Sequence, residues 1–184
     1  SWMETVEKHD PSKDIAECMD DDIAAILYTS GTTGRPKGAM LTHLNLASNA
    51  LELHRLWNFC PGDVLLHALP IYHVHGLFVA IHCAMLNVSK VWFLPHFELQ
   101  AVLNLIPHST IMMGIPTFYV RLLNNSKFNK KVCDRMRLFI SGSAPLLNET
   151  FDAFEVRTGH RILERYGMTE AGMITSNPYG SEKG

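Results

Sequence analysis

From Ile23 onward, short apolar runs alternate with longer segments in which apolar residues recur at helical spacing. The short runs are rich in branched and aromatic residues, and their length suits strands that are buried on both faces. We expect strands at residues 64–69, 91–94, 110–113, 138–140 and 162–164. Strands that alternate with helices are typical of an α/β fold in which crossover helices join the strands of a parallel sheet.

The helical segments carry start and stop signals. Residues 43–57 have an apolar stripe and follow Thr42, which suits an N-cap, and residues 147–158 end before Gly159, which is a typical helix stop. Three further helices are expected at residues 76–86, 99–106 and 116–124. With them the chain has enough elements for one α/β unit with a single core.

Four segments rich in Gly, Pro, Ser or His begin where an expected strand ends. They are residues 69–73, 114–117, 141–145 and 166–170. In open parallel sheets, ligands bind at the carboxyl ends of the strands. We therefore expect these four segments to converge on one crevice.

Composition and charge exclude several classes of protein. The 16 basic and 18 acidic residues are scattered, so no basic face suited to nucleic acid is expected. The four cysteines form no CxxC pair, which argues against a structural zinc site or a disulfide scaffold. The most apolar stretch, residues 74–88, is interrupted by His82 and Asn87 and is shorter than the roughly 20 residues of a membrane span. Nucleic acid and membrane insertion are therefore disfavoured.

The sharpest local signal is residues 29–38, Thr-Ser-Gly-Thr-Thr-Gly-Arg-Pro-Lys-Gly. Its glycines let backbone N–H groups turn toward a ligand, while its hydroxyls and lysine suit phosphate oxygens. It is not a Walker A loop, because that motif has Gly before the lysine and a hydroxyl after it, where this chain has Pro36 and Gly38. The alternative on composition alone is a surface turn.

Three motifs in order resemble the adenylate-forming superfamily of acyl-CoA synthetases, luciferases and peptide-synthetase adenylation domains. Residues 29–38 resemble its phosphate loop, residues 69–76 (Leu-Pro-Ile-Tyr-His-Val-His-Gly) its gate segment, and residues 166–170 its Tyr-Gly-Met-Thr-Glu motif. The resemblance implies that a carboxylate attacks the α-phosphate of ATP, that pyrophosphate leaves, and that a thiol, here coenzyme A, then attacks the acyl-adenylate.

The resemblance also implies roles for individual residues. The expected catalytic residues are His73, Lys37, Thr169 and Glu170, with Glu170 as the ligand of Mg²⁺. The β- and γ-phosphates of ATP would contact Thr29, Ser30, Gly31, Thr32, Thr33, Gly34 and Lys37, and the α-phosphate would contact Thr169. The adenine would be bordered by Gly142, Ser143, Ala144, Pro145, Glu164, Arg165, Tyr166, Gly167 and Met168.

Two histidines of the gate segment have competing interpretations. A lone histidine beside an aromatic residue is commonly a core residue bonded to a backbone carbonyl. The resemblance instead favours His73 as a residue that faces the acyl carboxylate and the α-phosphate. His75 is expected to line the acyl pocket, but packing between a helix and the sheet would explain it equally well.

The acid substrate is expected to be malonate. Residues 67–78, 116–123, 136–146 and 163–170 together resemble malonyl-CoA synthetases more than fatty-acid or coumarate ligases. In that group the arginine of the Pro-Thr-x-Tyr-x-Arg segment, here Arg121, is associated with the second carboxylate, with Ser141 and His75 as helpers. On spacing alone, a solvated helix arginine is the alternative for Arg121.

The family comparison also implies an incomplete domain. Residues 1–22 are expected to be a polar lead-in, and residues 23–184 part of the large N-terminal AMP-binding domain, without the ribose-binding aspartate or the C-terminal lid domain with its lysine. The expected activity is that of an ATP-dependent acid:CoA ligase, inactive as this chain alone. The alternatives are a ligase for another short, fatty or aromatic acid, or a non-catalytic nucleotide-binding module. The compartment stays open between cytoplasm and mitochondrion.

Overall fold

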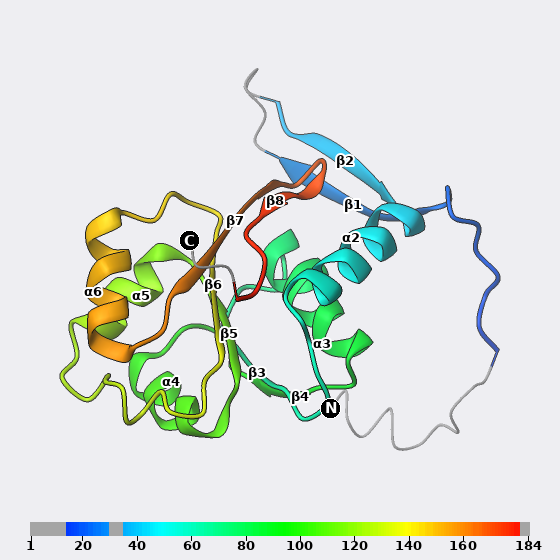
Figure 1. The fold of residues 1–184 in the computed structure, drawn as a ribbon. Helices are drawn as coiled ribbons and strands as arrows, with labels where there is room; N and C mark the ends of the chain where they lie inside the picture. The colour runs from blue at the N-terminus through cyan, green and yellow to red at the C-terminus, as the bar shows by residue number, and fades with distance from the viewer. Residues whose placement is uncertain (1–13, 30–34, 181–184) are drawn as a thin grey trace.

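The computed structural model describes residues 14–29 and 35–180. Its main feature is a six-stranded sheet of order β4-β3-β5-β6-β7-β8 (Figure 1). The strands are β3 (Val64–His67), β4 (Lys90–Phe93), β5 (Ile111–Gly114), β6 (Leu138–Ser141), β7 (Ile162–Met168) and β8 (Gly172–Ser176). All neighbours pair in parallel except β7 and β8, which are antiparallel. The expected α/β fold with a parallel sheet is confirmed.

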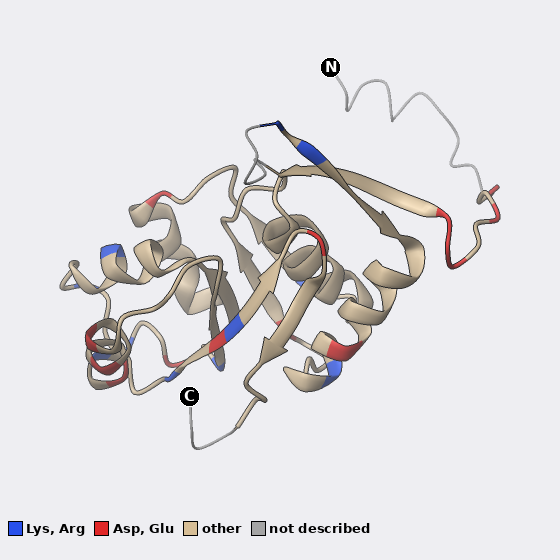
Figure 2. Cartoon of the chain, turned by 90° about the horizontal axis from the view of Figure 1, so that it is seen from above, with Lys and Arg blue, Asp and Glu red and all other residues tan. Residues whose placement is uncertain are grey.

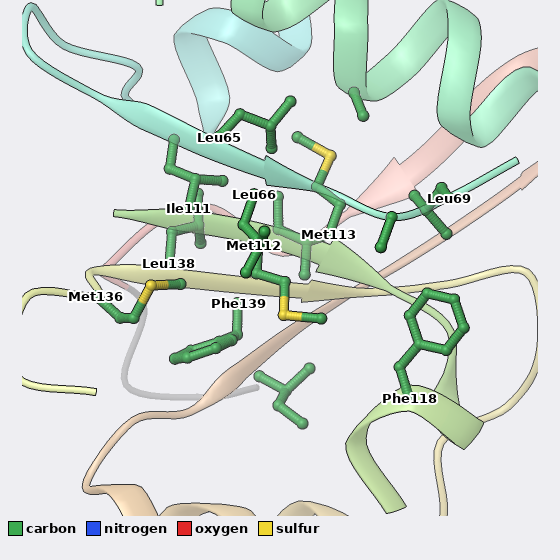
Figure 3. Close-up of a cluster of buried hydrophobic side chains, with 14 of the residues drawn as sticks. Leu65, Leu66, Leu69, Ile111, Met112, Met113, Phe118, Met136, Leu138 and Phe139 are labelled. Atoms are coloured by element: carbon green, nitrogen blue, oxygen red, sulfur yellow. The ribbon is translucent and has the colours of Figure 1, made fainter. Parts of the chain in front are cut away.

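The central strands are apolar because both faces of the sheet are covered. Every residue of β3, β5 and β6 is buried, and Figure 3 shows side chains such as Leu66, Met112 and Phe139 stacked across neighbouring strands. In Figure 1, α4, α5 and α6 lie on one side of the sheet, and α2 and α3 lie on the other. The two-sided burial explains why continuous apolar runs, rather than alternating patterns, marked these strands.

The helices follow the expected positions with small differences. They are α2 (His43–Leu56), η1 (His75–Ile81), α3 (His82–Leu86), α4 (Leu99–Leu105), η2 (Ile106–His108), α5 (Pro116–Leu123) and α6 (Asn148–Thr158). Thr42 caps α2 by accepting a bond from the Asn45 N–H at 3.2 Å, and Gly159 ends α6 with a φ of 75°. Both end signals in the sequence are confirmed.

Residues 76–86 are not one regular α-helix. Residues His75–Ile81 form a π-helical segment, and the α-helix proper begins at His82. A side chain at Gly76 would come within 2.3 Å of the Pro70 carbonyl oxygen, so this segment packs closely on the preceding loop. The hydrophobic pattern predicted the helix but could not reveal this wider turn.

Three strands and the extension of a fourth were not predicted from the sequence. β1 (Ile23–Thr29) and β2 (Lys37–Thr42) form a separate antiparallel pair, in which Thr29 lies opposite Lys37. At the other end of the chain, β7 runs on to Met168 and then pairs with β8. Residues 166–168 therefore lie inside a strand rather than after one, and only residues 169–171 form the turn.

The amino ends of the sheet are joined by an ion pair between a buried aspartate and a partly buried arginine. Asp63 precedes β3 and Arg137 precedes β6; Arg137 Nε donates to Asp63 Oδ1 at 2.8 Å, and Arg137 Nη2 bonds the other carboxylate oxygen. Thr110, which precedes β5, also donates to Asp63 Oδ1 at 2.8 Å. Burial alone would raise the pKa of Asp63, but bonds from Arg137, Cys60 and Thr110 outweigh it and lower that pKa.

Candidate active site

The carboxyl ends of the strands open into a cavity of about 500 Å³. All four segments singled out in the sequence line it, through residues such as His73, Thr117, Ser143 and Thr169. Met173 of β8 completes the wall. The expected convergence of these segments is confirmed, and it follows from the parallel arrangement of β3, β5, β6 and β7.

A second cavity of about 490 Å³ adjoins the first. Its walls are Ser143–Pro145, Glu164–Gly167 and Thr175–Asn177. Ser143, Ala144, Arg165 and Gly167 line both cavities. The site is therefore one crevice with two compartments that share a wall. The residues expected to border adenine, other than Gly142 and Met168, all line the second compartment.

Arg165 is a buried cation at the shared wall. Its side chain lies on β7, only 7% of the residue is exposed, and its Nε and Nη2 have no hydrogen-bond partner among the residues that the structure describes. Burial lowers its pKa to about 10, so the guanidinium is still charged at pH 7. A buried charge without a partner is costly. This cost favours a role for Arg165 with an anionic ligand.

Two further polar groups among the predicted site residues are buried and incompletely bonded; His75 lines the first cavity, whereas Ser141 lines neither cavity. The Ser141 hydroxyl and His75 Nε2 have no partner within the described part of the chain, and the two residues are 1% and 5% exposed. His75 Nδ1 lies 3.2 Å from Ser143 Oγ. Burial, followed by the charges of Arg165 and His67, lowers the pKa of His75 well below its usual value. His75 is therefore neutral at pH 7 and can accept or donate a hydrogen bond.

Gly142 provides the space that Arg165 occupies. A side chain at Gly142 would come within 2.4 Å of the Arg165 guanidinium carbon and 2.5 Å of Nε. Gly142 follows directly on β6, so the backbone there runs against the face of the arginine. The sequence analysis assigned Gly142 to the adenine side, and its contact with Arg165 could not be seen from spacing.

The expected catalytic residues lie at different places around the crevice. His73 and Thr169 line the first cavity; His73 is exposed, with its ring 4.7 Å from that of Tyr72. Glu170 is exposed at the tip of the β7–β8 turn and lines a small pocket of about 150 Å³ against α2. The structure thus brings His73 and Thr169 together at the cavity, with Glu170 next to Thr169.

Glu170 fits a magnesium ion that arrives with phosphate. Within residues 14–29 and 35–180, no group of three or more His, Cys, Asp or Glu side chains could hold a metal ion. Mg²⁺ commonly keeps several waters and takes one or two carboxylates together with substrate phosphates. One exposed carboxylate beside Thr169 is consistent with that mode, and it does not suit a permanently bound metal.

The ends of the phosphate loop belong to the β1–β2 pair. Lys37 is exposed at the start of β2, opposite Thr29, and neither residue lines the two cavities. Ser30, Gly31, Thr32, Thr33 and Gly34 lie outside the described residues. Their roles toward ATP remain predictions.

Arg121 is not among the residues that line either cavity. It is exposed on α5, and its guanidinium carbon sits 4.8 Å from the centre of the Phe97 ring. The cavity wall takes Pro116 and Thr117 from the same helix, but not Arg121. Arg165, which the sequence analysis assigned to adenine, is the cation that faces both compartments.

Two residues that shape the crevice are not marked by any motif in the sequence. Met173 lines the first cavity, and Asn49 of α2 lies against the β7–β8 turn through bonds to Met173. Met173 lies in a strand that the pattern did not reveal, and nothing in the sequence marks Asn49 apart from its polarity within an amphipathic helix.

The chain belongs to the AMP-binding enzyme family, whose model matches residues 2–184. It is 42% identical over 171 residues to the mitochondrial malonate–CoA ligase ACSF3 of Mus musculus and 39% identical over 178 residues to a malonate–CoA ligase of Arabidopsis thaliana. These alignments cover 84% and 86% of this chain and 29% of each relative. The chain therefore spans about a third of the length of these relatives.

Solved structures agree with the family assignment. ATP-bound MatB of Rhodopseudomonas palustris superposes with a TM-score of 0.88 at 55% identity, over 91% of this chain and 33% of that one. An anthranilate CoA ligase, AuaEII, shares the fold with a TM-score of 0.87 at 24% identity, over 100% of this chain and 36% of that one. The expected fold, a part of the large domain of an adenylate-forming enzyme, is confirmed.

Surface features agree with a small-molecule site. Figure 2 shows Lys and Arg residues dispersed among Asp and Glu residues instead of gathered on one face. None of the helices in the described part of the chain is long and apolar enough to cross a membrane. The crevice, and not an extended charged surface, is therefore the candidate binding site in the described part of the chain.

Proposed function

We propose that this chain supplies the adenylate-forming site of an ATP-dependent ligase that joins malonate to coenzyme A. The family and the malonate–CoA ligases among its relatives support the class of reaction. The observation that carries the choice of acid is Arg165, a buried cation without a described partner at the wall of the cavity. One carboxylate of malonate would react with ATP, and the other would pair with this guanidinium.

The reaction has two transfers. An oxygen of the malonate carboxylate bonds to the α-phosphorus of ATP, the bond from that phosphorus to the bridging oxygen breaks, and pyrophosphate leaves. The thiol of coenzyme A then loses its proton and bonds to the acyl carbon, and AMP leaves. Magnesium, when bound through Glu170, would offset charge on the leaving pyrophosphate.

The two compartments would bind different parts of the substrates. His73 and Thr169 at the first cavity would orient the reacting carboxylate and the α-phosphate, which holds the two groups at reacting distance. The second cavity would take adenine between Ser143–Pro145 and Glu164–Gly167. Lys37 and the loop before it would contact the outer phosphates once the β1–β2 pair lies over the nucleotide.

Ser141 and His75 would complete the site for the second carboxylate. Both present a buried polar atom without a described partner, and a carboxylate can accept bonds from a hydroxyl, a neutral imidazole N–H and a guanidinium at once. Arg121 stays a candidate helper by family resemblance, but its exposed place over Phe97 favours Arg165 as the principal partner.

The test is pyrophosphate release by a complete ligase that contains this chain, with malonate, methylmalonate, acetate, butyrate and a medium-chain fatty acid compared at equal concentration. We expect malonate to give the highest kcat/KM. A preference for butyrate or a longer acid would contradict the choice of malonate while leaving the ligase class intact. Nucleotide binding without pyrophosphate release from any acid would favour the non-catalytic module instead.

A further inference from the structure

Asn49 bonds to the β7–β8 turn as a neighbouring strand would. Its Nδ2 donates to the Met173 carbonyl oxygen at 3.0 Å, and its Oδ1 accepts from the Met173 N–H at 3.1 Å. β8 is the edge strand of the sheet, so its outward backbone groups have no strand to pair with. One side chain of α2 therefore satisfies both outward groups of Met173.

The backbone around this contact is shaped for close approach. Gly172 has a φ of 67°, a left-handed conformation that favours glycine, and a side chain there would meet Asn49 Oδ1 at 3.0 Å. Across the hairpin, a side chain at Gly167 would come within 2.4 Å of the Gly172 carbonyl oxygen. Asn49, Gly172 and Gly167 thus fix how the turn sits against α2.

A second side-chain bond ties Trp57, the residue that directly follows α2, to the other end of the same strand. Trp57 Nε1 donates to Ser176 Oγ at 2.9 Å, three residues further along β8. The two ties differ in what they hold. The Trp57 tie lies at the end of β8 remote from the turn, whereas the Asn49 tie lies next to residues 169–171, which carry Thr169 and Glu170.

We propose that Asn49 is a positioning residue that holds Thr169 and Glu170 in place for adenylation. The inference rests on the proposed function, because it assigns those two residues to the α-phosphate and to magnesium. A two-stranded ribbon with a free edge is poorly held by itself. Small displacements of groups that contact the reacting atoms cost rate, so a tie at the base of the turn serves catalysis as well as folding.

The test compares three variants of a complete ligase that contains this chain. Asn49→Ala removes both bonds to Met173, and Gly172→Ala strains the same junction from the strand side. Trp57→Phe is the matched control, because it removes the other α2–β8 bond and disturbs a buried site without touching the turn. Each variant is assayed for kcat, for the KM of the acid, for the magnesium concentration that gives half-maximal rate, and for Tm.

We expect Asn49→Ala to lower kcat by about 10- to 100-fold and to raise the magnesium requirement, as is usual for residues that orient a metal ligand, with little change in the KM of the acid. Gly172→Ala should behave alike, and the double variant should lose less than the product of the two single effects. Trp57→Phe should lower Tm and leave kcat and the magnesium requirement unchanged.

Two outcomes separate this inference from the proposed function. If Glu170→Gln leaves the rate and the magnesium requirement unchanged, the assigned role of Glu170 is wrong. If Glu170→Gln disables the enzyme but Asn49→Ala and Trp57→Phe lower Tm with equal, unchanged kinetics, Asn49 is only a structural residue and the inference is overturned.

Discussion

An arginine lies at each end of the parallel sheet, partly buried at the amino ends and buried at the carboxyl ends, and the two differ in their bonding. At the amino ends, Arg137 bonds both oxygens of Asp63 and also donates to the backbone oxygens of Trp57 and Asn58, at 3.4 Å and 3.0 Å. At the carboxyl ends, Arg165 has two guanidinium nitrogens without a partner in the described ranges. The same residue type is thus fully bonded at one end and left open at the other.

The difference in bonding between the two arginines indicates which end of the sheet is built for stability and which end for binding a ligand. A buried ion pair resists loss of either partner, because the remaining charge would be left uncompensated. An unpaired buried arginine lowers stability unless a ligand brings the missing charge. The contrast therefore locates the binding end of the sheet without reference to any relative.

The largest effect is expected from Arg165→Leu in a complete ligase. It should cost malonate about 3–5 kcal/mol in kcat/KM, the range for breaking a buried charge pair, and should raise stability by about 1 kcal/mol. Butyrate should lose little. The matched variant Arg121→Leu removes an exposed arginine and should leave the malonate preference in place. Both acids are followed by pyrophosphate release.

A loss of malonate use in Arg121→Leu, with none in Arg165→Leu, would restore the assignment drawn from the sequence. Equal losses for malonate and butyrate in Arg165→Leu would mean that Arg165 does not sense the second carboxylate. Gly142→Ala offers a check that keeps the charge, since its methyl group would displace the guanidinium and should also weaken malonate use selectively.

The second largest effect is a loss of stability at the amino ends of the strands. Arg137→Met should lower the free energy of unfolding by about 3 kcal/mol, because Asp63 is buried and would lose its charged partner. The malonate preference should not change in the protein that remains folded. Denaturant unfolding of wild type and variant measures the loss. If Arg137→Met is as stable as wild type, the Asp63–Arg137 ion pair does not stabilise the amino end of the sheet.

The third effect is a pH dependence of stability to which His75 of the first cavity contributes. Because the pKa of His75 is lowered in the folded state, the unfolded chain binds more protons below about pH 6.5, and stability should fall as pH drops below that value. Burial shifts the pKa values of His67 and His82 in the same direction. Asp63, with its pKa lowered from 3.8, contributes only at much lower pH.

Each histidine with a lowered pKa should reduce the free energy of unfolding by at most about 1.4 kcal/mol for each pH unit below its unfolded pKa. Thermal unfolding between pH 7.5 and pH 5.5 measures the slope, and His75→Asn should reduce it. A slope that is unchanged in His75→Asn would assign the dependence to other groups. Arg137→Met should keep the slope of wild type over this range.

The smallest effect is expected from Ser141→Ala. The hydroxyl lacks a partner within the described residues, so its removal should change the free energy of unfolding by less than about 0.5 kcal/mol. The same substitution should weaken kcat/KM for malonate by about 1 kcal/mol, the contribution of one hydrogen bond. Kinetics with malonate and butyrate measure the difference between the two acids. Equal effects on both acids would remove Ser141 from the site of the second carboxylate.

The sequence predicted those parts of the fold that rest on two-sided burial. β3, β5 and β6 are continuous apolar runs because helices cover both faces, and Thr42 and Gly159 marked helix ends through local chemistry. β2 and β8 were missed because their faces are largely exposed and their residues mix Lys, Gly, Thr and Ser with apolar ones. β1 is an apolar run, but most of its residues are exposed or only partly buried, so burial in a central sheet does not account for it.

The motifs predicted which segments form the candidate site. They did not predict which side chains of those segments face the crevice. The four segments meet in one crevice, as the strand ends required. Which arginine faces that crevice depends on the register of β7 and on the direction of one turn of α5, and neither is encoded in spacing alone. The motifs gave Arg121 and Arg165 different roles, and the structure adds that Arg165 is buried whereas Arg121 is exposed.

The strand that carries Arg165 is held differently along its length. Ile162, Leu163 and Glu164 pair with β6 inside the sheet, whereas the residues from Arg165 to Met168 pair only with β8. Amide hydrogens of the first part should exchange with deuterium slowly, as in the core, and those of the second part should exchange sooner through local opening. The crevice wall is therefore the part of β7 that can respond to an occupant while the sheet behind it stays closed.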